Sequence, residues 1–440
     1  MTAQRIKEVR LTAFKSFRDE AFPLAPLTVL IGRNSSGKSN ALDGLEVLSR
    51  LAHGDDIVDA LESRSGPAGS VRGGLTGCVP HGSDRFSLGC TVGTERGPVH
   101  LDVTVQVTPD VRIVEECLSG PTAEGHRDVL KSSPRNPQSG YARVNLHEDG
   151  GTGTGTGTEQ ATLSRWQLLS SQISAFANVS PDWQSTIWCA DTMLSALRNV
   201  FHLDPVPHLM RQYVPARDAN LRRTAENLSA AVGRIERADP ALFQRLVSLL
   251  RGLADHDIDT LAVSRSDLGD VMLALDEGDL GLTPAREMSD GMLRFLAVTT
   301  ALLTGGDGLD LGSSRTEAAE RSLMLVIEEL ENGLHASQAA EVLKLVREAS
   351  AENSTQALIT THSPALLSAL DGADHEGVVV CWRDRATGRS RLTRLTELDG
   401  YPAAMAAGSL GDVITHGRLD NRQRRGDRDY TEFNRLLGIE

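Results

Sequence analysis

The sequence has little lysine, few aromatic residues and an excess of acidic side chains. Only five of its 45 basic residues are lysines, and Phe, Trp and Tyr make up 4% of the 440 residues. The 59 acidic residues give a formal net charge of −14, which argues against a protein that is basic all over and coats nucleic acid. A local basic patch stays open, because net charge does not report where charges lie. The hydrophobic content of 40% can fill a core and excludes disorder of the whole chain.

Long apolar runs and paired cysteines are also missing. The longest apolar stretch, at 293–303, is interrupted by Arg294 and by threonines, whereas crossing a bilayer takes roughly 20 apolar residues. Charges stand near the N-terminus, where a signal peptide requires an apolar run. The five cysteines are scattered without a CxxC pair, which favours reduced thiols and argues against zinc. We therefore expect a cytoplasmic protein without a membrane segment.

Hydrophobic spacing predicts a parallel α/β core. A nearly continuous apolar strand at 27–31 precedes a Gly-rich turn, after which apolar residues from Ala41 to Leu51 recur at helical spacing. Period-2 stretches within 65–115 predict antiparallel strands. The later chain alternates between predicted strands and helices, which is typical of a parallel sheet: strands at 322–327, 356–361 and 378–382, and helices at 289–304, 336–350 and 364–370.

The strongest motif stands between that first strand and its helix. Residues 32–39 read GRNSSGKS and match GxxxxGK[ST] in full. Backbone N–H groups of such a loop surround phosphate oxygens, the lysine contacts the β and γ phosphates, and the hydroxyl ligates Mg²⁺. With lysine so scarce, a chance match is on the order of one in a hundred to two hundred. The motif predicts ATP-binding residues Gly32, Arg33, Asn34, Ser35, Ser36, Gly37, Lys38 and Ser39.

Two acids, Glu328 and Glu329, follow the apolar strand 322–327. Phosphoryl transfer needs one acid to hold Mg²⁺ and its waters, and a second to orient or deprotonate the attacking water. Acids of this kind belong at the C-terminal edge of a parallel sheet. An acidic pair is also common as a solvated strand end, and it is the P-loop elsewhere in the chain that favours the functional interpretation.

Two weaker motifs lie nearby in the sequence. In Thr360–Pro364, directly after a predicted strand, His362 can hydrogen-bond a γ-phosphate or the attacking water, although a lone histidine is more often structural. In Met288–Phe295, Ser289 or Asp290 is typical of a helix N-cap, and a helix N-terminus can also meet a phosphate.

In this order the four motifs resemble the SMC/RecF-like branch of ABC-type ATPases. More narrowly, the chain is similar to the RecF/OLD-type AAA-family ATPases without a long coiled coil. Phe14–Phe17 (FKSF), Asn40 after the P-loop and Glu331–His335 (ENGLH) match the same group. The resemblance is strong over 1–50 and 285–382, thin over 200–250 and absent over 119–160.

The resemblance implies two heads that dimerise around two ATP molecules. Ser289 and Gly291 of one head would contact, in trans, the γ-phosphate held by the P-loop of the other, and Asn40 would belong to the ATP-binding set. Mg²⁺ would be held by Ser39 and Glu328.

Three further roles are implied in the same way. Glu329 would be the general base, His362 would sense the γ-phosphate, and a glutamine would reach Mg²⁺ and the attacking water. Gln172 is our candidate for that glutamine, Gln167 is its rival, and a solvated helical glutamine is the alternative.

The chain departs from the family pattern at two places. The acidic pair is normally Asp-Glu followed by Pro, whereas here it is Glu328-Glu329-Leu330. The extra methylene of Glu328 shifts its carboxylate, so slow hydrolysis, or a clamp that stays bound to ATP, is an alternative. OLD-type nucleases also carry a Toprim domain with an acidic metal site, and no such pattern follows Trp382. We expect no nuclease activity from this chain alone.

These observations predict an α/β P-loop NTPase with an ABC/SMC-head-like fold: a parallel core sheet, an antiparallel β lobe and an inserted helical lobe. A Gly-Thr repeat at 151–158, with nearby prolines and serines, predicts a flexible insertion. The predicted segments are 1–118 (first part of the head), 119–160 (flexible insertion), 161–284 (mainly helical lobe), 285–400 (second part of the head) and 401–440 (a tail of mixed charge).

The function we expect is an ATP-hydrolysing molecular switch, with ATP and Mg²⁺ as cofactors. It would act as a homodimer or higher oligomer on DNA or on a separate effector protein, in DNA repair or anti-phage defence. The alternative is a nucleotide-dependent scaffold for a partner nuclease or toxin, with little turnover. A membrane-transport ATPase subunit fits less well, because of the FKSF opening and the Ser289-Asp290-Gly291 signature.

Overall fold

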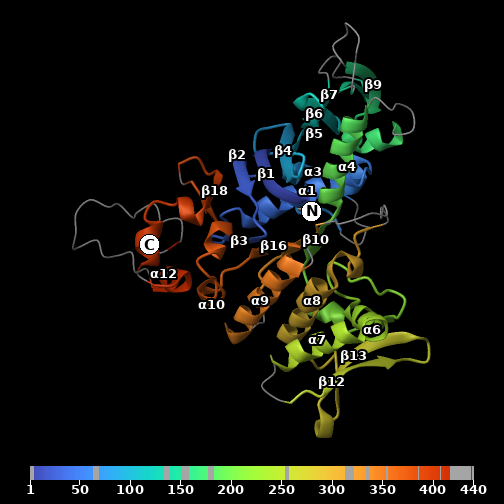
Figure 1. Cartoon of the computed structure of the whole chain (residues 1–440), viewed down its shortest axis with the longest axis vertical. Coiled ribbons are helices and arrows are strands. Elements are labelled where there is room, and N and C mark those ends of the chain that lie inside the picture. Colours follow the sequence, from blue (N-terminus) through green and yellow to red (C-terminus); the bar gives the residue numbers. More distant parts are fainter. Residues whose placement is uncertain are drawn as a thin grey trace, which may run out of the picture.

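One long sheet runs through most of the molecule (Figure 1). The computed structural model describes residues 4–62, 69–132, 139–147, 149, 158–176, 183–252, 257–312, 322–332, 336–352, 355–384, 386–406, 408–416 and 438. Across the sheet, the described strands are β10 (Val200–Leu203), β15 (Met324–Ile327), β16 (Gln356–Thr360), β3 (Leu27–Ile31), β17 (Val378–Arg383), β18 (Ser390–Arg394), β2 (Phe17–Pro23), β1 (Arg5–Phe14), β4 (Arg85–Gly93), β5 (Val99–Gln106), β6 (Arg112–Thr122), β7 (Gly125–Ser132), β8 (Tyr141–His147) and β9 (Thr158–Ser164).

The first five strands of this order, β10, β15, β16, β3 and β17, pair in parallel and form the core. They come from the beginning, the middle and the end of the chain, so the two predicted parts of the head share one sheet. This arrangement confirms the predicted α/β class with a parallel core sheet. The predicted strands differ from those observed by at most two residues at an end, which is the usual uncertainty of strand boundaries.

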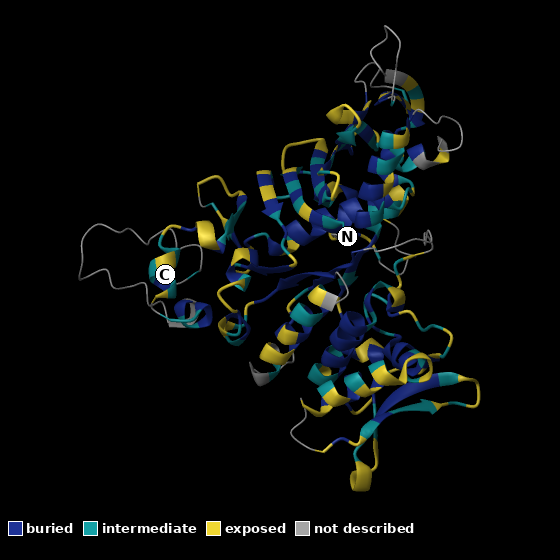
Figure 2. Cartoon of the chain, viewed as in Figure 1, coloured by how far each residue is buried: buried dark blue, intermediate teal, exposed yellow. Residues whose placement is uncertain are grey.

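Helices cover both faces of the core. Every residue of β3 is buried, and its side chains alternate between two hydrophobic cores, with Val29 and Ile31 in one and Leu30 in the other. Helix α1 (Lys38–Ala52) packs in the core of Leu30, whereas α8 (Asp290–Thr304) and α9 (Ala336–Glu352) pack in the other. Figure 2 shows the central strands buried between these helices.

The sheet continues through β4 to β9 as an antiparallel lobe, at the upper right of Figure 1. The predicted flexible insertion at 119–160 is wrong for its described part, because β7 and β8 extend the sheet. Alternate residues of β8, among them Ala142, Val144 and Leu146, are buried, and this period-2 pattern outweighs the polar composition. The repeat at 151–157 lies outside the described residues.

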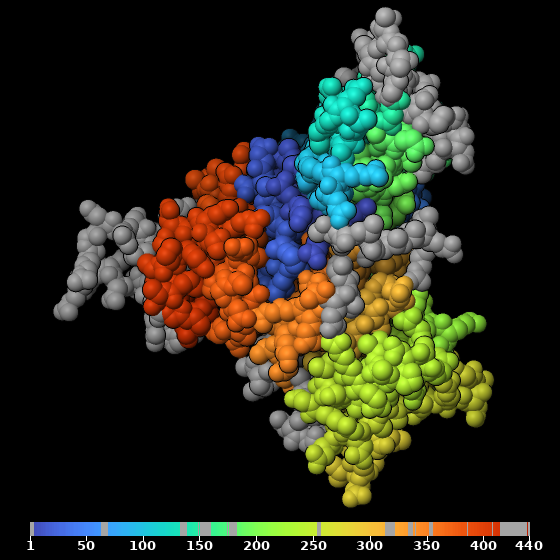
Figure 3. Space-filling model, viewed as in Figure 1, coloured from blue at the N-terminus to red at the C-terminus, as the bar shows by residue number. Residues whose placement is uncertain are grey.

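A second lobe lies at the lower right of Figure 1 and in the yellow-green to yellow part at the lower right of Figure 3. It contains α5 (Pro207–Met210), α6 (Leu228–Ala238), α7 (Pro240–Arg251) and a small sheet of β11 (Val214–Pro215), β12 (Thr260–Arg265), β13 (Asp270–Asp276) and β14 (Leu282–Pro284).

This lobe begins later than the predicted boundary at residue 161. Helix α4 (Gln184–Arg198) buries Met193 and Leu194 in the core shared with the β lobe, and β10 joins the central sheet. Helical periodicity identifies α4 as a helix but does not report which sheet it covers, because the packing partner is distant in sequence.

At the C-terminal end, β17 and β18 pair in antiparallel fashion as a hairpin. Helix α10 (Pro364–Ser368) precedes β17, whereas α11 (Tyr401–Met405) and α12 (Leu410–His416) follow β18. Helix α12 lies beside the label C in Figure 1. Most of the predicted tail, residues 417–437, lies outside the described residues. Among the described helices, none is both long and apolar enough to cross a membrane.

The β lobe contains a fully buried acid whose titration affects stability. Glu116 accepts the backbone N–H groups of Leu169 and Ser170, each at 2.7 Å, and is 0% exposed. Burial outweighs these bonds and raises the pKa of its carboxyl from 4.5 to about 7. Between pH 4.5 and about 7, Glu116 keeps its proton in the folded protein and has released it in the unfolded chain. The free energy of unfolding therefore falls as the pH rises through this range.

We predict that raising the pH from 4.5 to 7 removes up to about 3 kcal/mol of stability through Glu116. Glu116→Gln should flatten this part of the stability profile, measured by urea unfolding at several pH values. Glu115→Gln, a change at the exposed neighbouring residue, is the control and should keep the wild-type slope. Equal slopes for the wild type and Glu116→Gln would contradict the prediction.

Candidate functional site

The loop between β3 and α1 curls tightly and closes on its own lysine. Gly32, Ser35 and Gly37 have φ angles of +148°, +65° and +118°, in a region that L-residues with a side chain rarely adopt. The ammonium of Lys38 donates to the carbonyl oxygens of Gly32 at 2.7 Å and of Arg33 at 3.3 Å. Lys38 is 9% exposed, and burial lowers the pKa of its ammonium. Its charge therefore lies inside the loop, where a phosphate-binding lysine is needed.

Two of the glycines are required by close packing as well as by backbone angle. A Cβ atom on Gly32 would lie 2.0 Å from the carbonyl oxygen of Cys381, at the end of β17. A Cβ atom on Gly37 would lie 2.4 Å from the Oγ atom of Ser390. Neither distance is compatible with a side chain, so the loop packs directly against the β17–β18 hairpin.

A network of side-chain hydroxyl and amide groups holds the loop in place through hydrogen bonds. Ser390 donates to the carbonyl oxygen of Ser36 at 2.6 Å, and its Oγ atom lies 2.8 Å from that of Ser16. Asn40 donates to Ser16 at 2.8 Å. The structure therefore uses Ser16, in the FKSF segment, and Asn40 to position the loop. Ser390 was not among the predicted site residues, since it lies 354 positions from Ser36 and belongs to no motif.

The two acids lie at the edge where β15 and β16 end. The backbone N–H of Glu329 donates to the Thr360 hydroxyl at 2.8 Å, which ties the two strand ends together. Its carboxylate accepts from Asn332 at 2.6 Å. Glu329 has a φ angle of +47°, an uncommon conformation for a residue with a side chain. Such strain is typical of positions that the surrounding structure holds for function.

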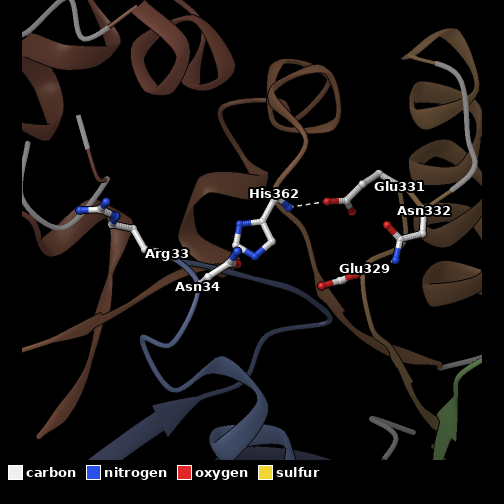
Figure 4. A pocket seen from close by; sticks show the side chains of 6 residues that line it. All are labelled: Arg33, Asn34, Glu329, Glu331, Asn332 and His362. Carbon is white, nitrogen blue, oxygen red and sulfur yellow. Dashed lines mark hydrogen bonds between the residues drawn. The ribbon is translucent and has the colours of Figure 1, made fainter. Parts of the chain in front are cut away.

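A pocket of about 520 Å³ opens between the loop and these strand ends (Figure 4). Its lining brings together parts of three predicted motifs: Arg33, Asn34, Glu329, Glu331, Asn332 and His362. The backbone N–H of His362 donates to the Glu331 carboxylate at 2.5 Å, the dashed line in Figure 4. Burial, and then the charge of Lys38, lower the pKa of the His362 imidazole, which favours the neutral ring at pH 7.

The residues present fit a nucleoside triphosphate. The described site combines a buried ammonium, a glycine-rich turn at a helix N-terminus and a neutral imidazole that can donate or accept. Two buried polar atoms, the Oγ of Ser36 and the Oε2 of Glu331, have no hydrogen-bond partner among the described residues. Unpaired buried polar atoms are costly unless a ligand or water pairs with them.

For Mg²⁺ the predicted ligands are Ser39 and Glu328. Glu328 accepts from the guanidinium of Arg72 at 2.7 Å. Burial raises the pKa of its carboxyl, although Arg72 opposes the shift. No group of three or more His, Cys, Asp or Glu side chains in the described part of the chain could hold a metal alone.

Three predicted residues lie away from this pocket. Ser289 caps α8, accepting from the N–H of Met292 at 3.2 Å, and neither it nor Gly291 lines the pocket. Both Ser289 and its neighbour Asp290 are exposed.

Gln172 is engaged elsewhere as well. Its amide is hydrogen-bonded to the backbone N–H and carbonyl of Ser164, each at 2.9 Å, and more weakly to Leu168. Its role as a magnesium ligand stays a prediction, and it would require these bonds to break.

Fold and site together define an AAA-type P-loop domain, with the P-loop on a parallel sheet and a paired acidic strand end beside it. The chain belongs to the family described as "AAA domain, putative AbiEii toxin, Type IV TA system", whose profile matches residues 27–97 and 175–368. No curated protein matches the sequence significantly.

Several solved SMC head domains are similar in structure. The Pyrococcus furiosus Smc head with an extended coiled coil, bound to the C-terminal domain of ScpA, has a TM-score of 0.47 and 12% identity, and the match covers 89% of this chain and 96% of that one. The SMC head domain from Thermotoga maritima has a TM-score of 0.41 and 12% identity, with coverage of 89% and 98%.

Packing at Gly37 gives a prediction with a matched control. Gly37→Ala combines an unfavourable φ angle with a clash against Ser390, so it should weaken ATP binding at least about tenfold and lower the melting temperature. Gly125→Ala has a similar φ angle, +105°, but nothing within 4 Å. It should cost only the backbone strain, about 1–2 kcal/mol, and keep wild-type ATP affinity. Calorimetry of both variants checks this, and equal affinities would contradict the role assigned to the close contact.

Proposed function

We propose that this protein is an ATP-hydrolysing molecular switch whose heads dimerise around ATP and Mg²⁺. One observation carries the proposal: Glu329, His362 and the P-loop residues Arg33 and Asn34 line the same pocket, although they come from three separate segments. Family membership supports nucleotide binding at this place. The hydrolysis and the dimer are what the experiments below test.

In this proposal each group has a defined task. Lys38 leaves its loop carbonyls to contact the β and γ phosphates. Glu329, held by Thr360 and Asn332, accepts a proton from the attacking water. The neutral His362 hydrogen-bonds the γ-phosphate. Mg²⁺, held by Ser39 and Glu328, would neutralise developing charge on the phosphates.

Dimerisation is supported by the location of the α8 N-terminus. Ser289 and Asp290 are exposed and Gly291 is partly exposed, and neither Ser289 nor Gly291 lines the pocket in its own chain. Residues with this arrangement can complete the site of a second copy. Gln172 could serve as a magnesium ligand only in a state in which its amide no longer bonds to Ser164 and Leu168.

The proposed target is DNA or a separate effector protein, in DNA repair or anti-phage defence. We place the switch in the cytoplasm, because all five cysteines are free thiols. We also propose 1–118 and 285–400 as the two parts of one head, since their strands share one sheet.

A scaffold with little turnover is the second candidate. The ion pair between Glu328 and Arg72 favours it, because a carboxylate held by an arginine is less available to Mg²⁺. Under this alternative, ATP binding alone would build the surface that a partner nuclease or toxin recognises.

Two variants separate these candidates. Lys38→Ala should abolish multiple-turnover phosphate release, whereas Lys131→Ala, at an exposed lysine of the β lobe, should leave it unchanged. Glu329→Gln should bind ATP, reduce phosphate release at least about a hundredfold and accumulate a dimer, measured by light scattering.

A wild-type rate no higher than that of Glu329→Gln would favour the scaffold. If ATP leaves the mass of Glu329→Gln at that of a monomer, the composite site between two heads is wrong.

A further inference from the structure

Arg72 connects the candidate magnesium ligand to the helix that follows the P-loop. Its Nη2 atom donates to the Oε1 atom of Glu328 at 2.7 Å, and its Nε atom donates to the Oδ1 atom of Asp43 at 3.0 Å. Asp43 belongs to α1, five residues after Lys38. One guanidinium therefore bridges a buried carboxylate beside the phosphate-binding loop and the carboxylate at the end of β15.

The Asp43 end of this bridge is firmly anchored. Asp43 is 1% exposed and also accepts from the Lys15 ammonium at 2.7 Å. Lys15 donates in addition to the backbone carbonyl of Arg72 at 2.8 Å. Two cations and two carboxylates thus form a closed cluster in which both the backbone and the side chain of Arg72 are held against α1. A charge-assisted network of this kind fixes geometry better than a single pair.

The Glu328 end is looser. The Arg72 and Glu328 side chains are 48% and 24% exposed, so water screens their pairing. Asp204 directly follows β10, and the parallel register sets Leu203 beside Ile327, which brings Asp204 next to Glu328. Two carboxylates at adjacent strand ends repel each other, and Arg72 supplies a positive charge beside Glu328.

We propose that Arg72 is a positioning residue that holds Glu328 while no magnesium is bound, and that Mg²⁺ arriving with ATP takes the carboxylate in exchange. This inference rests on the proposed function of Glu328. The exchange is reversible, because Asp43 keeps the guanidinium of Arg72 in place, and Lys15 keeps its backbone in place, after Glu328 leaves it. The longer side chain of Glu328 is what lets one carboxylate serve either cation.

Because of this exchange, Arg72 competes with Mg²⁺ for the Glu328 carboxylate and raises the Mg²⁺ concentration that ATP binding needs. Removing the guanidinium should lower the Mg²⁺ concentration needed for half-maximal binding of ATP. A partly exposed ion pair corresponds to a change of about two- to fivefold in that concentration. ATP affinity without Mg²⁺ should stay unchanged, since Arg72 is assigned no contact with phosphate.

The test measures binding of a fluorescent ATP analogue to the full-length protein over a magnesium titration, so it does not depend on hydrolysis. Arg72→Gln is compared with Arg85→Gln, a change at an arginine of similar exposure, 47%, that pairs with Asp84 at 2.9 Å in the β lobe. The half-maximal magnesium concentration should fall two- to fivefold for Arg72→Gln and stay at the wild-type value for Arg85→Gln.

Glu328→Asp supplies a second variant that leaves the cluster of Lys15, Asp43 and Arg72 whole. Its carboxylate is withdrawn from the guanidinium by one methylene, so it should also lower the magnesium requirement. Adding Arg72→Gln to Glu328→Asp should then change little, which a double-mutant comparison detects.

Three results would overturn the inference: an unchanged magnesium requirement in Arg72→Gln, a higher one, or a loss of ATP affinity when magnesium is absent. The last result would make Arg72 a phosphate ligand instead. If the wild-type protein binds no ATP at any magnesium concentration, it is the proposed function that fails.

Discussion

Main-chain hydrogen bonds between β15, β16 and β3 hold three distant parts of the chain in parallel register. Because the strands run in the same direction, their C-terminal ends meet at one edge of the sheet. That edge carries the P-loop after Ile31, the acids after Ile327 and His362 after Thr360. The site depends on this pairing, since none of these groups is close to another in sequence.

The same edge explains why the P-loop is so tightly packed. The loop follows β3 and lies against the end of β17, the next strand in the sheet, where Gly32 leaves no room for a Cβ atom beside Cys381. Ser390 on the adjoining strand then supports the loop through Ser36. A phosphate-binding loop therefore forms between two strands that the sheet already fixes, with little freedom to collapse when empty.

The sequence was most informative where function requires particular residue types at fixed spacing. The P-loop glycines, Lys38 and the apolar strand before the acids are local patterns, and the structure has the strand–loop–helix and strand-end contexts that they predict. The β lobe was only partly predictable, because the composition of 119–160 obscured the period-2 burial of β8. The position of α4 beside that lobe was missed, since helical periodicity reports a buried face and not its partner.

Contacts across long sequence separations were beyond prediction. Arg72 and Glu328 are 256 residues apart, and Ser36 and Ser390 are 354 apart. No local motif marks either Arg72 or Ser390, and both owe their place to the folded sheet. The replacement of the usual aspartate by Glu328 was visible in the sequence as a departure, and the structure adds a physical partner for the longer side chain.

The central claim is that ATP binds where the ends of β3, β15 and β16 meet, and that a second copy completes the site. A structure of the Glu329→Gln protein with ATP and Mg²⁺ tests it most directly. The account predicts the γ-phosphate against Lys38 and His362, with the Lys38 ammonium moved off the carbonyl of Gly32 and Ser289 supplied by the other copy. A nucleotide bound elsewhere, or a phosphate site completed within a single chain, would contradict the account.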